Sequence, residues 1–412
     1  MSVRPWLPSP LPLPSLLLPL VTLLVASAAL TRAISISHHS HGHRGPSAAA
    51  VLSSSTQSTR ALERRAAFLS ALRQLPALVT KDRPGTTVLE IPEPPVLPHE
   101  KEYMDAWVQS GFGGPDVIER REFLMPSPEP HQVLVKVKAA ALNPVDIGRR
   151  TGFFKGFMNE SFPFIPGYDF SGTVEGVGKD VSRWRTGMEV YGYPHEIGVR
   201  PQRYGTLGEY LVIDQSFIAA KPKSISHEEA ASLPTAIMTS LQAFEMLHIK
   251  PGDAVLFTGG AGGVGTQAVQ LLKHYCGAGY VATTGSGFKT QLLEELGASV
   301  VVDFLKQNFT DVLKDLDSAI DATGEWWECL QCVKEGGHVV TIRGGPGRPA
   351  NVPFFTVQAR GSDLEKVHDL YEKGIVRPVV DSVFPFDSLP LAFSRLETGR
   401  VTGKVIVRGP SL

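Results

Sequence analysis

The chain contains few cysteines, and Cys276, Cys329 and Cys332 are all that its 412 residues hold. Three thiols cannot build the framework of several disulfides that stabilises small secreted domains. The chain also lacks a basic excess, because 40 Lys and Arg residues are matched by 41 Asp and Glu residues. The resulting net charge of −1 argues against nucleic acid as a partner. With 42% hydrophobic residues, the chain can instead bury the cores of two domains.

Acidic residues are missing from the N-terminal segment until Glu63. This segment has an apolar run, Leu11–Leu30, which includes the small residues Ala26–Ala28 typical of a signal-peptidase site. Three prolines weaken the run as a membrane helix, so we expect no more than transient membrane contact. The Ser- and Arg-rich tract that follows is typical of transit peptides. We predict that residues 1–98 are a disordered targeting leader and linker. A bipartite plastid address is favoured, and the mitochondrion and the secretory pathway are alternatives.

The most informative motif lies between a predicted strand, Asp253–Phe257, and a predicted helix, Thr266–Tyr275. Its glycines have the G-x-G-x-x-G spacing of a dinucleotide-binding turn, in which backbone N–H groups at a helix start hold the pyrophosphate. A glycine turn without a ligand is the alternative. The residues we expect to hold the cofactor here are Gly260, Ala261, Gly262, Gly263, Val264 and Gly265.

An acidic residue is missing from the segment Gly279–Lys289, where an NAD site usually carries one for the ribose 2′-hydroxyl. The hydroxyl of Ser286 and the ammonium of Lys289 would instead bind a 2′-phosphate. We therefore predict NADPH as the cofactor, with Thr284 in the same site. The alternative for Lys289 is an ordinary surface lysine.

The chain before the glycine turn shows short strands broken by Gly, Pro and Asp, which predict an antiparallel, barrel-like domain. From Glu228 to about Asp369 the pattern alternates between helix and strand, as a doubly wound parallel sheet requires. The last predicted strand, Gly403–Val407, returns to the first domain. The predicted fold class is therefore α/β with a second, barrel-type domain.

Six strings along the chain are informative when they are taken together: Ala141–Asp146, Pro166–Gly172, Gly205–Tyr210, Ala230–Pro234, Gly260–Gly265 and Leu396–Lys404. They resemble the medium-chain dehydrogenase/reductase superfamily, and within it the zinc-free quinone oxidoreductase branch. The strongest resemblance is to plant alkenal/enone oxidoreductases, including those that reduce 2-methylene-furan-3-ones, and it covers about residues 102 to 408.

This resemblance implies a GroES-like catalytic domain over 101–225, completed by about 375–412. It also implies a Rossmann NADPH-binding domain over 226–374, with Gly344 at the cofactor, and either a monomer or a homodimer.

Zinc ligands of the related alcohol dehydrogenases are replaced in this sequence. Where those enzymes carry a Cys shortly before an Asp, and a Gly-His-Glu further on, this chain has Asn143–Asp146 and Gly167-Tyr168-Asp169. No thiolate or imidazole is left for a catalytic zinc, and three cysteines are too few for the structural one. We predict that the protein uses no zinc.

Without a Lewis acid, hydride transfer to an activated alkene or a quinone is favoured over reduction of a simple carbonyl. We expect an NADPH-dependent reductase of the C=C bond of enones and enals. A quinone oxidoreductase and a non-catalytic NADPH-binding protein are the alternatives. The resemblance places Asn143 at the nicotinamide ribose or substrate, Tyr168 at the substrate oxygen, Lys155 at the site's mouth and Thr239 beside the carboxamide. Tyr168 as a core aromatic and Lys155 as a surface lysine are their alternatives.

The pair Cys329 and Cys332 has C-x-x-C spacing but is predicted to lie in mid-helix, between a strand and Gly336-Gly337. A thioredoxin-like pair would open its helix, and a zinc site needs a second pair. We expect two free thiols.

Overall fold

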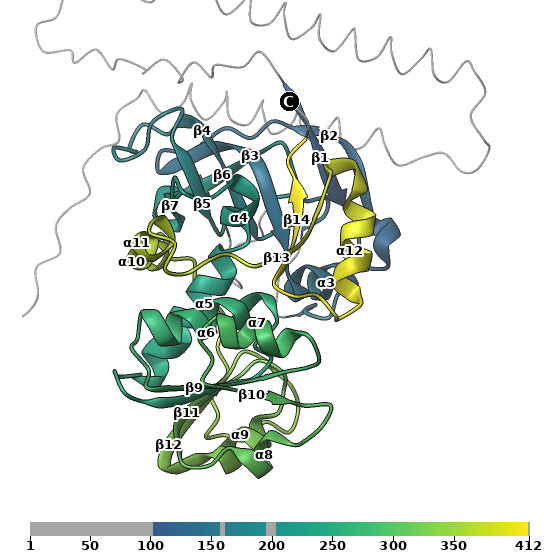
Figure 1. Cartoon of the computed structure of the whole chain (residues 1–412). Helices are drawn as coiled ribbons and strands as arrows, with labels where there is room; N and C mark the ends of the chain where they lie inside the picture. The colour runs from purple at the N-terminus through teal and green to yellow at the C-terminus, as the bar shows by residue number, and fades with distance from the viewer. Residues whose placement is uncertain (1–101, 157–160, 195–202, 411–412) are drawn as a thin grey trace, which may run out of the picture. The chain divides into compact units, whose positions relative to one another are not determined.

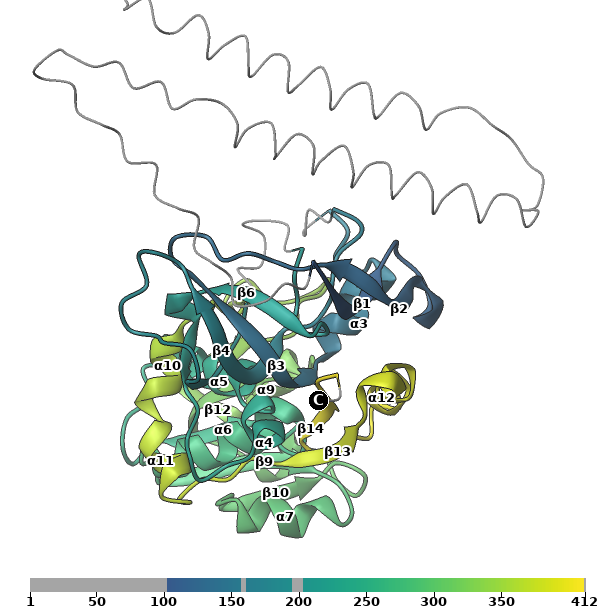
Figure 2. The same ribbon diagram turned by 90° about the horizontal axis from the view of Figure 1, so that it is seen from above.

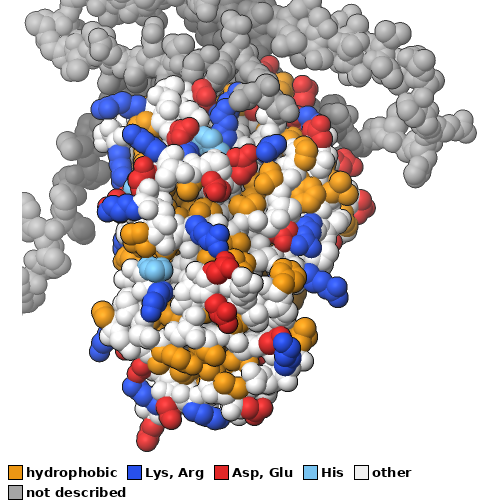
Figure 3. All heavy atoms as spheres, in the orientation of Figure 1, with side chains coloured by type: hydrophobic (Ala, Val, Ile, Leu, Met, Phe, Trp, Pro, Cys, Tyr) orange, Lys and Arg blue, Asp and Glu red, His pale blue; other side chains and the backbone are white. Residues whose placement is uncertain are grey.

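The computed structural model describes residues 102–156, 161–194 and 203–410, drawn as coloured ribbon in Figure 1. The predicted leader and linker, 1–98, lie outside the described residues. Within the described ranges, no helix has both the length and the hydrophobicity needed to cross a bilayer. On the face shown in Figure 3, acidic and basic side chains are interspersed.

A mostly antiparallel sheet of seven strands forms the first half of the fold. Its central strand, β3 (Gln132–Leu142), alternates between two cores: Val133, Val135 and Val137 pack on one side, and Leu134 and Leu142 on the other. This period of two is the pattern of a strand with both faces covered. The sheet order is β13-β14-β3-β4-β5-β7, with β6 paired to β3.

The other strands of this sheet come from distant parts of the chain. They are β4 (Asp169–Val177), β5 (Glu189–Gly192), β6 (Tyr210–Asp214), β7 (Ile218–Ala220), β13 (Val380–Phe384) and β14 (Lys404–Arg408). The predicted return of the last strand is confirmed, since β14 pairs with β3 over residues 405–408. Figures 1 and 2 both show β13 and β14 among the strands of the first sheet, although they come last in the sequence.

Smaller elements surround this sheet. A hairpin of β1 (Tyr103–Gln109) and β2 (Ile118–Leu124) is tied to the C-terminal part by a hydrogen bond from Trp107 Nε1 to the Phe386 carbonyl (2.9 Å). Helix α12 (Leu389–Glu397) packs on β14 and on α3 (Pro144–Thr151). Helices α4 (His227–Ala231), α10 (Gly361–Lys366) and α11 (His368–Glu372) complete this group.

The second sheet is fully parallel, with the order β10-β9-β8-β11-β12. The first three strands along the chain therefore run in reverse spatial order and the next two extend the other edge, which is the Rossmann arrangement. Its strands are β8 (Ala254–Phe257), β9 (Tyr280–Gly285), β10 (Val300–Asp303), β11 (Leu316–Asp321) and β12 (Val333–Thr341).

Helices cover both faces of the parallel sheet. Figure 1 shows α5 (Pro234–Leu247), α6 (Gly263–His274) and α7 (Lys289–Glu295) on one side, with α8 (Phe309–Val312) and α9 (Trp326–Cys332) on the other. Because both faces are buried, strands such as β8 are continuous apolar runs. The predicted fold class, a Rossmann sheet with a GroES-like domain, is thus confirmed.

The prediction that both cysteines lie in mid-helix needs a correction. Helix α9 ends at Cys332, and Gly336 and Gly337 lie inside β12 instead of beyond a longer helix. The pairing of β11 with β12 shifts register here, so the glycines fall in a bulge. Cys329 and Cys332 are free and buried, and burial raises the pKa of Cys332 to about 11.

Candidate active site

The glycine turn follows β8 at the carboxyl edge of the parallel sheet. A Cβ atom on Gly265 would lie 2.4 Å from the Gly259 carbonyl oxygen, so α6 packs directly on the turn. A Cβ on Gly260 would lie 2.2 Å from Thr283 Oγ1 on β9. A Cβ on Gly262, in contrast, would meet just the Gly259 oxygen, at 3.4 Å. Gly260 and Gly265 thus allow close packing, whereas Gly262 borders open space.

That open space lies at the N-terminus of α6. Gly262 is the N-cap residue and contributes no side-chain hydrogen bond, so the first N–H groups of this twelve-residue helix keep their capacity to donate. An anion is favoured at such an end by the N–H groups and by the helix dipole. Gly263 and Val264 begin the helix and are half-buried. The turn therefore fits the pyrophosphate of a dinucleotide.

The end of β9 contains the residues predicted to choose the cofactor. Thr284 is buried, and its hydroxyl accepts a hydrogen bond from the Gly259 N–H (2.8 Å), so it supports the turn from behind. Ser286 is half-buried just beyond the strand. Lys289 Nζ donates to the carbonyl oxygens of Arg400 and Val401, at 3.1 Å each, and burial lowers its pKa.

Folding brings an acid to this loop that the local sequence does not contain. Asp303 ends β10 opposite Gly285, and its carboxylate accepts from the Gly287 N–H (3.5 Å). The same carboxylate pairs with Lys306 (3.1 Å), and this contact lowers the pKa of Asp303. The segment Gly279–Lys289 thus contains no acid of its own, but strand pairing brings the Asp303 carboxylate to the same loop.

Gly344 lies in the exposed loop after β12, on the same carboxyl edge of the parallel sheet. A Cβ there would lie 3.4 Å from the Phe354 ring. Its predicted contact with the cofactor stays a prediction.

A buried polar cluster lies at one edge of the first sheet, where β3 ends and where β4 and β14 begin. Asn143 Nδ2 donates to Asp169 Oδ2 (2.9 Å). Lys404 Nζ donates to the same oxygen (2.8 Å) and to Asn143 Oδ1. The other oxygen, Asp169 Oδ1, accepts from the N–H (2.8 Å) and the hydroxyl (2.6 Å) of Thr235 at the start of α5. We call these four residues the Asn143 cluster.

A second carboxyl group adjoins the Asn143 cluster. Asp146 is 2% exposed, and its Oδ2 accepts from the Asn143 N–H (2.7 Å). Its Oδ1 is buried without a hydrogen-bond partner among the described residues. Burial raises the pKa of Asp146 to about 7, although the nearby charge of Lys404 opposes this shift.

The other predicted catalytic residues differ in their burial and in whether they lie next to the Asn143 cluster. Tyr168 is fully buried and stacks on Tyr193, with ring centroids 5.6 Å apart. It directly precedes Asp169. Thr239 is buried on α5, one turn after Thr235 and therefore on the same helix face. Lys155 is exposed, and its ammonium lies 5.9 Å from the centre of the Phe112 ring. The structure therefore does not bring Lys155 to the cluster.

Sequence reasoning missed Lys404, Asp169 and Thr235 as site residues. Asp169 and Lys404 stand in strings that carried the resemblance, but those strings do not show that the two side chains meet. The signal that was available is a charged residue placed directly before an apolar run at the start of a strand, as Lys404 precedes Val405–Val407.

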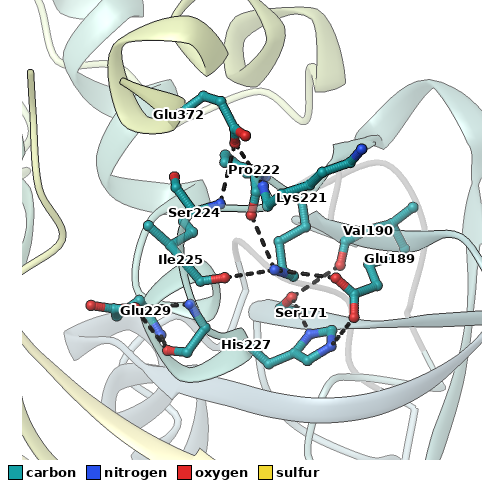
Figure 4. Close-up of polar contacts among 12 residues, drawn as sticks. Ser171, Glu189, Val190, Lys221, Pro222, Ser224, Ile225, His227, Glu229 and Glu372 are labelled. Atoms are coloured by element: carbon teal, nitrogen blue, oxygen red, sulfur yellow. Dashed lines mark hydrogen bonds and ion pairs between the residues drawn. The ribbon is translucent and has the colours of Figure 1, made fainter. Parts of the chain in front are cut away.

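A second polar group, the Lys221 cluster of Ser171, Glu189, Lys221 and His227, has the elements of a Ser-His-Glu triad (Figure 4). His227 Nδ1 lies 2.8 Å from Ser171 Oγ, and its Nε2 lies 3.2 Å from Glu189 Oε1. Ser171, however, is fully buried and its hydroxyl is within donating distance of the Val190 carbonyl (3.1 Å). A nucleophilic serine needs access to substrate, so this group is structural.

Metal-ligating side chains do not gather in the described part of the chain: no group of three or more His, Cys, Asp or Glu residues there could hold an ion.

Comparison with known proteins agrees with this architecture. Residues 129–223 match the family model described as an alcohol dehydrogenase GroES-like domain, and residues 296–407 match that of a zinc-binding dehydrogenase. The chain is 42% identical to a 2-methylene-furan-3-one reductase of Solanum lycopersicum over 308 residues, which covers 74% of this chain and 79% of that protein. A chloroplastic NADPH-dependent alkenal/one oxidoreductase of Arabidopsis thaliana is 41% identical over the same shares.

Among solved structures, the quinone oxidoreductase from Coxiella burnetii superposes with a TM-score of 0.67 at 31% identity. The match covers 74% of this chain and 99% of that one. The glycine turn on its Rossmann sheet, the GroES-like sheet beside it and these relatives lead to one conclusion: the chain is an oxidoreductase of the medium-chain dehydrogenase/reductase family with a nicotinamide cofactor site.

Proposed function

We propose that this protein reduces the C=C bond of α,β-unsaturated carbonyls with NADPH and without zinc. The observation that carries the proposal is the Asn143 cluster. The strings in which the related alcohol dehydrogenases carry metal ligands here contribute the Asn143 amide and the Asp169 carboxylate, and both are paired with the ammonium of Lys404. Such a set can orient hydrogen-bond donors toward a developing oxyanion, but it offers no soft ligand to a zinc ion.

The residues of the parallel sheet would hold the cofactor, which supplies a hydride when bound. The α6 N-terminus and the turn at Gly262 would take the pyrophosphate. Ser286 and Lys289 would take the 2′-phosphate. Lys289 would then exchange its two carbonyl partners, Arg400 and Val401, for the phosphate oxygens.

The residues of the first sheet would orient the substrate. The Asn143 amide is held by Asp169 and Lys404, and its second N–H makes just a long contact with the Ala141 carbonyl (3.4 Å). Because this contact is the weaker one, we expect that N–H to be the donor that a ligand can take over. Tyr168 directly precedes Asp169 in the sequence, and its hydroxyl would donate to the enolate oxygen. Thr239 lies on the same face of α5 as Thr235.

The names of the relatives support the choice of substrate. The tomato protein is named as a 2-methylene-furan-3-one reductase and the Arabidopsis protein as an NADPH-dependent alkenal/one oxidoreductase. A quinone reductase is the second candidate, because the matched Coxiella burnetii structure is a quinone oxidoreductase.

The test is to incubate the full chain with NADPH and an enone, an enal or a quinone, and then to identify the products. A saturated ketone from the enone supports the proposal, whereas an allylic alcohol would refute it. Turnover of quinones alone would move the assignment to the second candidate. Metal analysis of the same preparation tests the absence of zinc, which one zinc ion per chain would overturn.

We also propose an organelle, favouring the plastid, as the location. The acid-free N-terminal segment supports this proposal, and so do the chloroplastic and mitochondrial locations in the names of several relatives. A fluorescent protein fused to residues 1–100 should enter plastids, and cytosolic fluorescence would contradict the proposal.

A further inference from the structure

The side chain of Lys404 runs between the glycine turn and the Asn143 cluster. The residue before it, Gly403, donates its N–H to the Ala261 carbonyl of the turn (2.9 Å). A Cβ on Gly263, the first residue of α6, would lie 2.5 Å from Lys404 Cδ. The methylene chain of Lys404 therefore lies against the start of the helix that is expected to hold the pyrophosphate.

The other end of this side chain is buried and charged. Lys404 is 5% exposed and Asp169 is 0% exposed, and their ion pair measures 2.8 Å. A buried pair of this kind is costly unless its remaining lone pairs are also satisfied. Here Asn143 and Thr235 supply those partners. The ammonium thus fixes the orientation of the Asn143 amide, with Oδ1 toward Lys404 and Nδ2 toward Asp169.

Gly263 has a role in this arrangement that differs from that of its neighbour Gly262. At Gly262 a methyl group would enter the space expected for the phosphates. At Gly263 it would collide with the Lys404 side chain. The two glycines are adjacent in sequence, but one faces the ligand space and the other faces a lysine.

We propose that Lys404 is a positioning residue that orients the Asn143 amide relative to the cofactor turn, and that Gly263 is glycine so that the Lys404 side chain can pass. The proposal rests on the proposed function for its turnover readout. Its binding and pH readouts do not need turnover.

The charge of Lys404 should also be measurable through Asp146. The charged and titratable groups that face Asp146 are Lys404 from β14, Asp169 from β4, Arg149 from its own helix, and Tyr193. Lys404 now favours the ionised form of Asp146, so its removal should raise the pKa of Asp146 above about 7. A residue with a purely packing role would not produce this shift.

The main variants are Lys404→Met and the double variant Lys404→Met/Asp169→Asn, which removes both charges of the ion pair together. Lys373→Met, at the exposed C-cap of α11, controls for loss of a lysine. We expect kcat for the enone to fall on the order of 10²-fold in both main variants. The double variant should regain most of the thermal stability without regaining kcat. If kcat recovers together with stability, Lys404 is merely structural and the proposal is overturned.

The adjacent glycines give a second comparison. Gly262→Ala should weaken NADPH binding, measured by cofactor fluorescence, about tenfold. Gly263→Ala should leave that dissociation constant within about threefold while it lowers kcat. Equal losses of NADPH binding in both variants would contradict the separate role of Gly263.

A third measurement separates this proposal from the proposed function. The pH at which protein stability changes should move upward in Lys404→Met, whether or not any substrate is turned over. The double variant should shift less, because the charge of Asp169 raises the pKa of Asp146 and its loss opposes the shift. If the wild type reduces no enone or quinone but this shift appears, the proposed function fails and the electrostatic role of Lys404 stands. An unchanged pH profile would overturn that role.

Discussion

Lys221 and Lys404 are both buried lysines paired with an acid on the first sheet, yet their surroundings differ in kind. Lys221 Nζ donates to two backbone carbonyls, those of Pro222 (3.0 Å) and Ile225 (2.6 Å), as Figure 4 shows. Its acid, Glu189, is half exposed to water. Lys404 Nζ donates to side chains, and its acid is fully buried.

This difference separates a structural lysine from one suited to a site. Backbone carbonyls belong to the fixed path of the chain, so the Lys221 cluster closes the link between β7 and α4. The partners of Lys404 are side chains of the candidate site, so its ammonium can hold the Asn143 amide in one orientation. Burial and charge alone would have marked both lysines equally, and the identity of the partner atoms distinguishes them.

The largest expected effect is a pH dependence of stability that Asp146, the second acid beside Lys404, should cause. Because the folded-state pKa of Asp146 is about 7 against an ordinary 3.8, the folded chain binds a proton that the unfolded chain has lost between those values. Stability should therefore fall as the pH rises from about 4 to 7, by on the order of 4 kcal/mol. Urea titrations at a series of pH values measure this slope. Asp146→Asn keeps an acceptor for the Asn143 N–H and should remove the slope; an unchanged slope would show that another group causes it.

The next effect contrasts the two lysines directly. Lys221→Met should lower the free energy of unfolding by about 2–3 kcal/mol, because two buried carbonyl oxygens lose their donor. Its kcat should stay within about threefold of the wild type, whereas Lys404→Met loses far more kcat. Chemical unfolding and steady-state rates on the same preparations provide the measurement. A loss of kcat in Lys221→Met as large as in Lys404→Met would abolish the distinction.

A third lysine tests the cofactor choice. Lys289→Ala should raise KM for NADPH about tenfold, since a charge-assisted contact to the 2′-phosphate is lost, with little change for NADH. Initial rates with both cofactors measure this. Lys373→Ala is the control, because Lys373 is an exposed lysine that pairs with Asp369 and not with a residue of this loop. Equal use of NADH and NADPH by the wild type would contradict the predicted phosphate site.

The smallest effect belongs to His227 of the Lys221 cluster. Burial lowers its pKa below the ordinary 6.5, even though Glu189 favours the charged ring. The folded chain thus binds this proton less readily than the unfolded chain. Its contribution to stability is present above about pH 6.5 and is lost as the pH falls through the lower folded-state pKa. Thermal melts of His227→Gln, with exposed His131→Gln as control, should show a flatter acid limb for the first variant alone.

Local sequence was sufficient for the glycine turn and for the fold class. The turn, its strand and its helix occupy one continuous stretch, and each glycine spacing has a steric reason within that stretch. The alternation of apolar residues in β3 and the apolar run of β8 likewise indicate which of their side chains are buried. The absence of thiolate and imidazole residues at 143 and 167–169 was visible in the same way.

Tertiary structure alone decided which polar side chains meet. Asn143, Asp169 and Lys404 are far apart in sequence and come together because neighbouring strands of the first sheet place the end of β3 beside the starts of β4 and β14. The same applies to Asp303, which β-pairing brings opposite Gly285. The periodicity of a segment indicates which face a residue lies on and whether it is buried. Strand order and register depend on the whole chain, and they determine which charged side chains share one buried site.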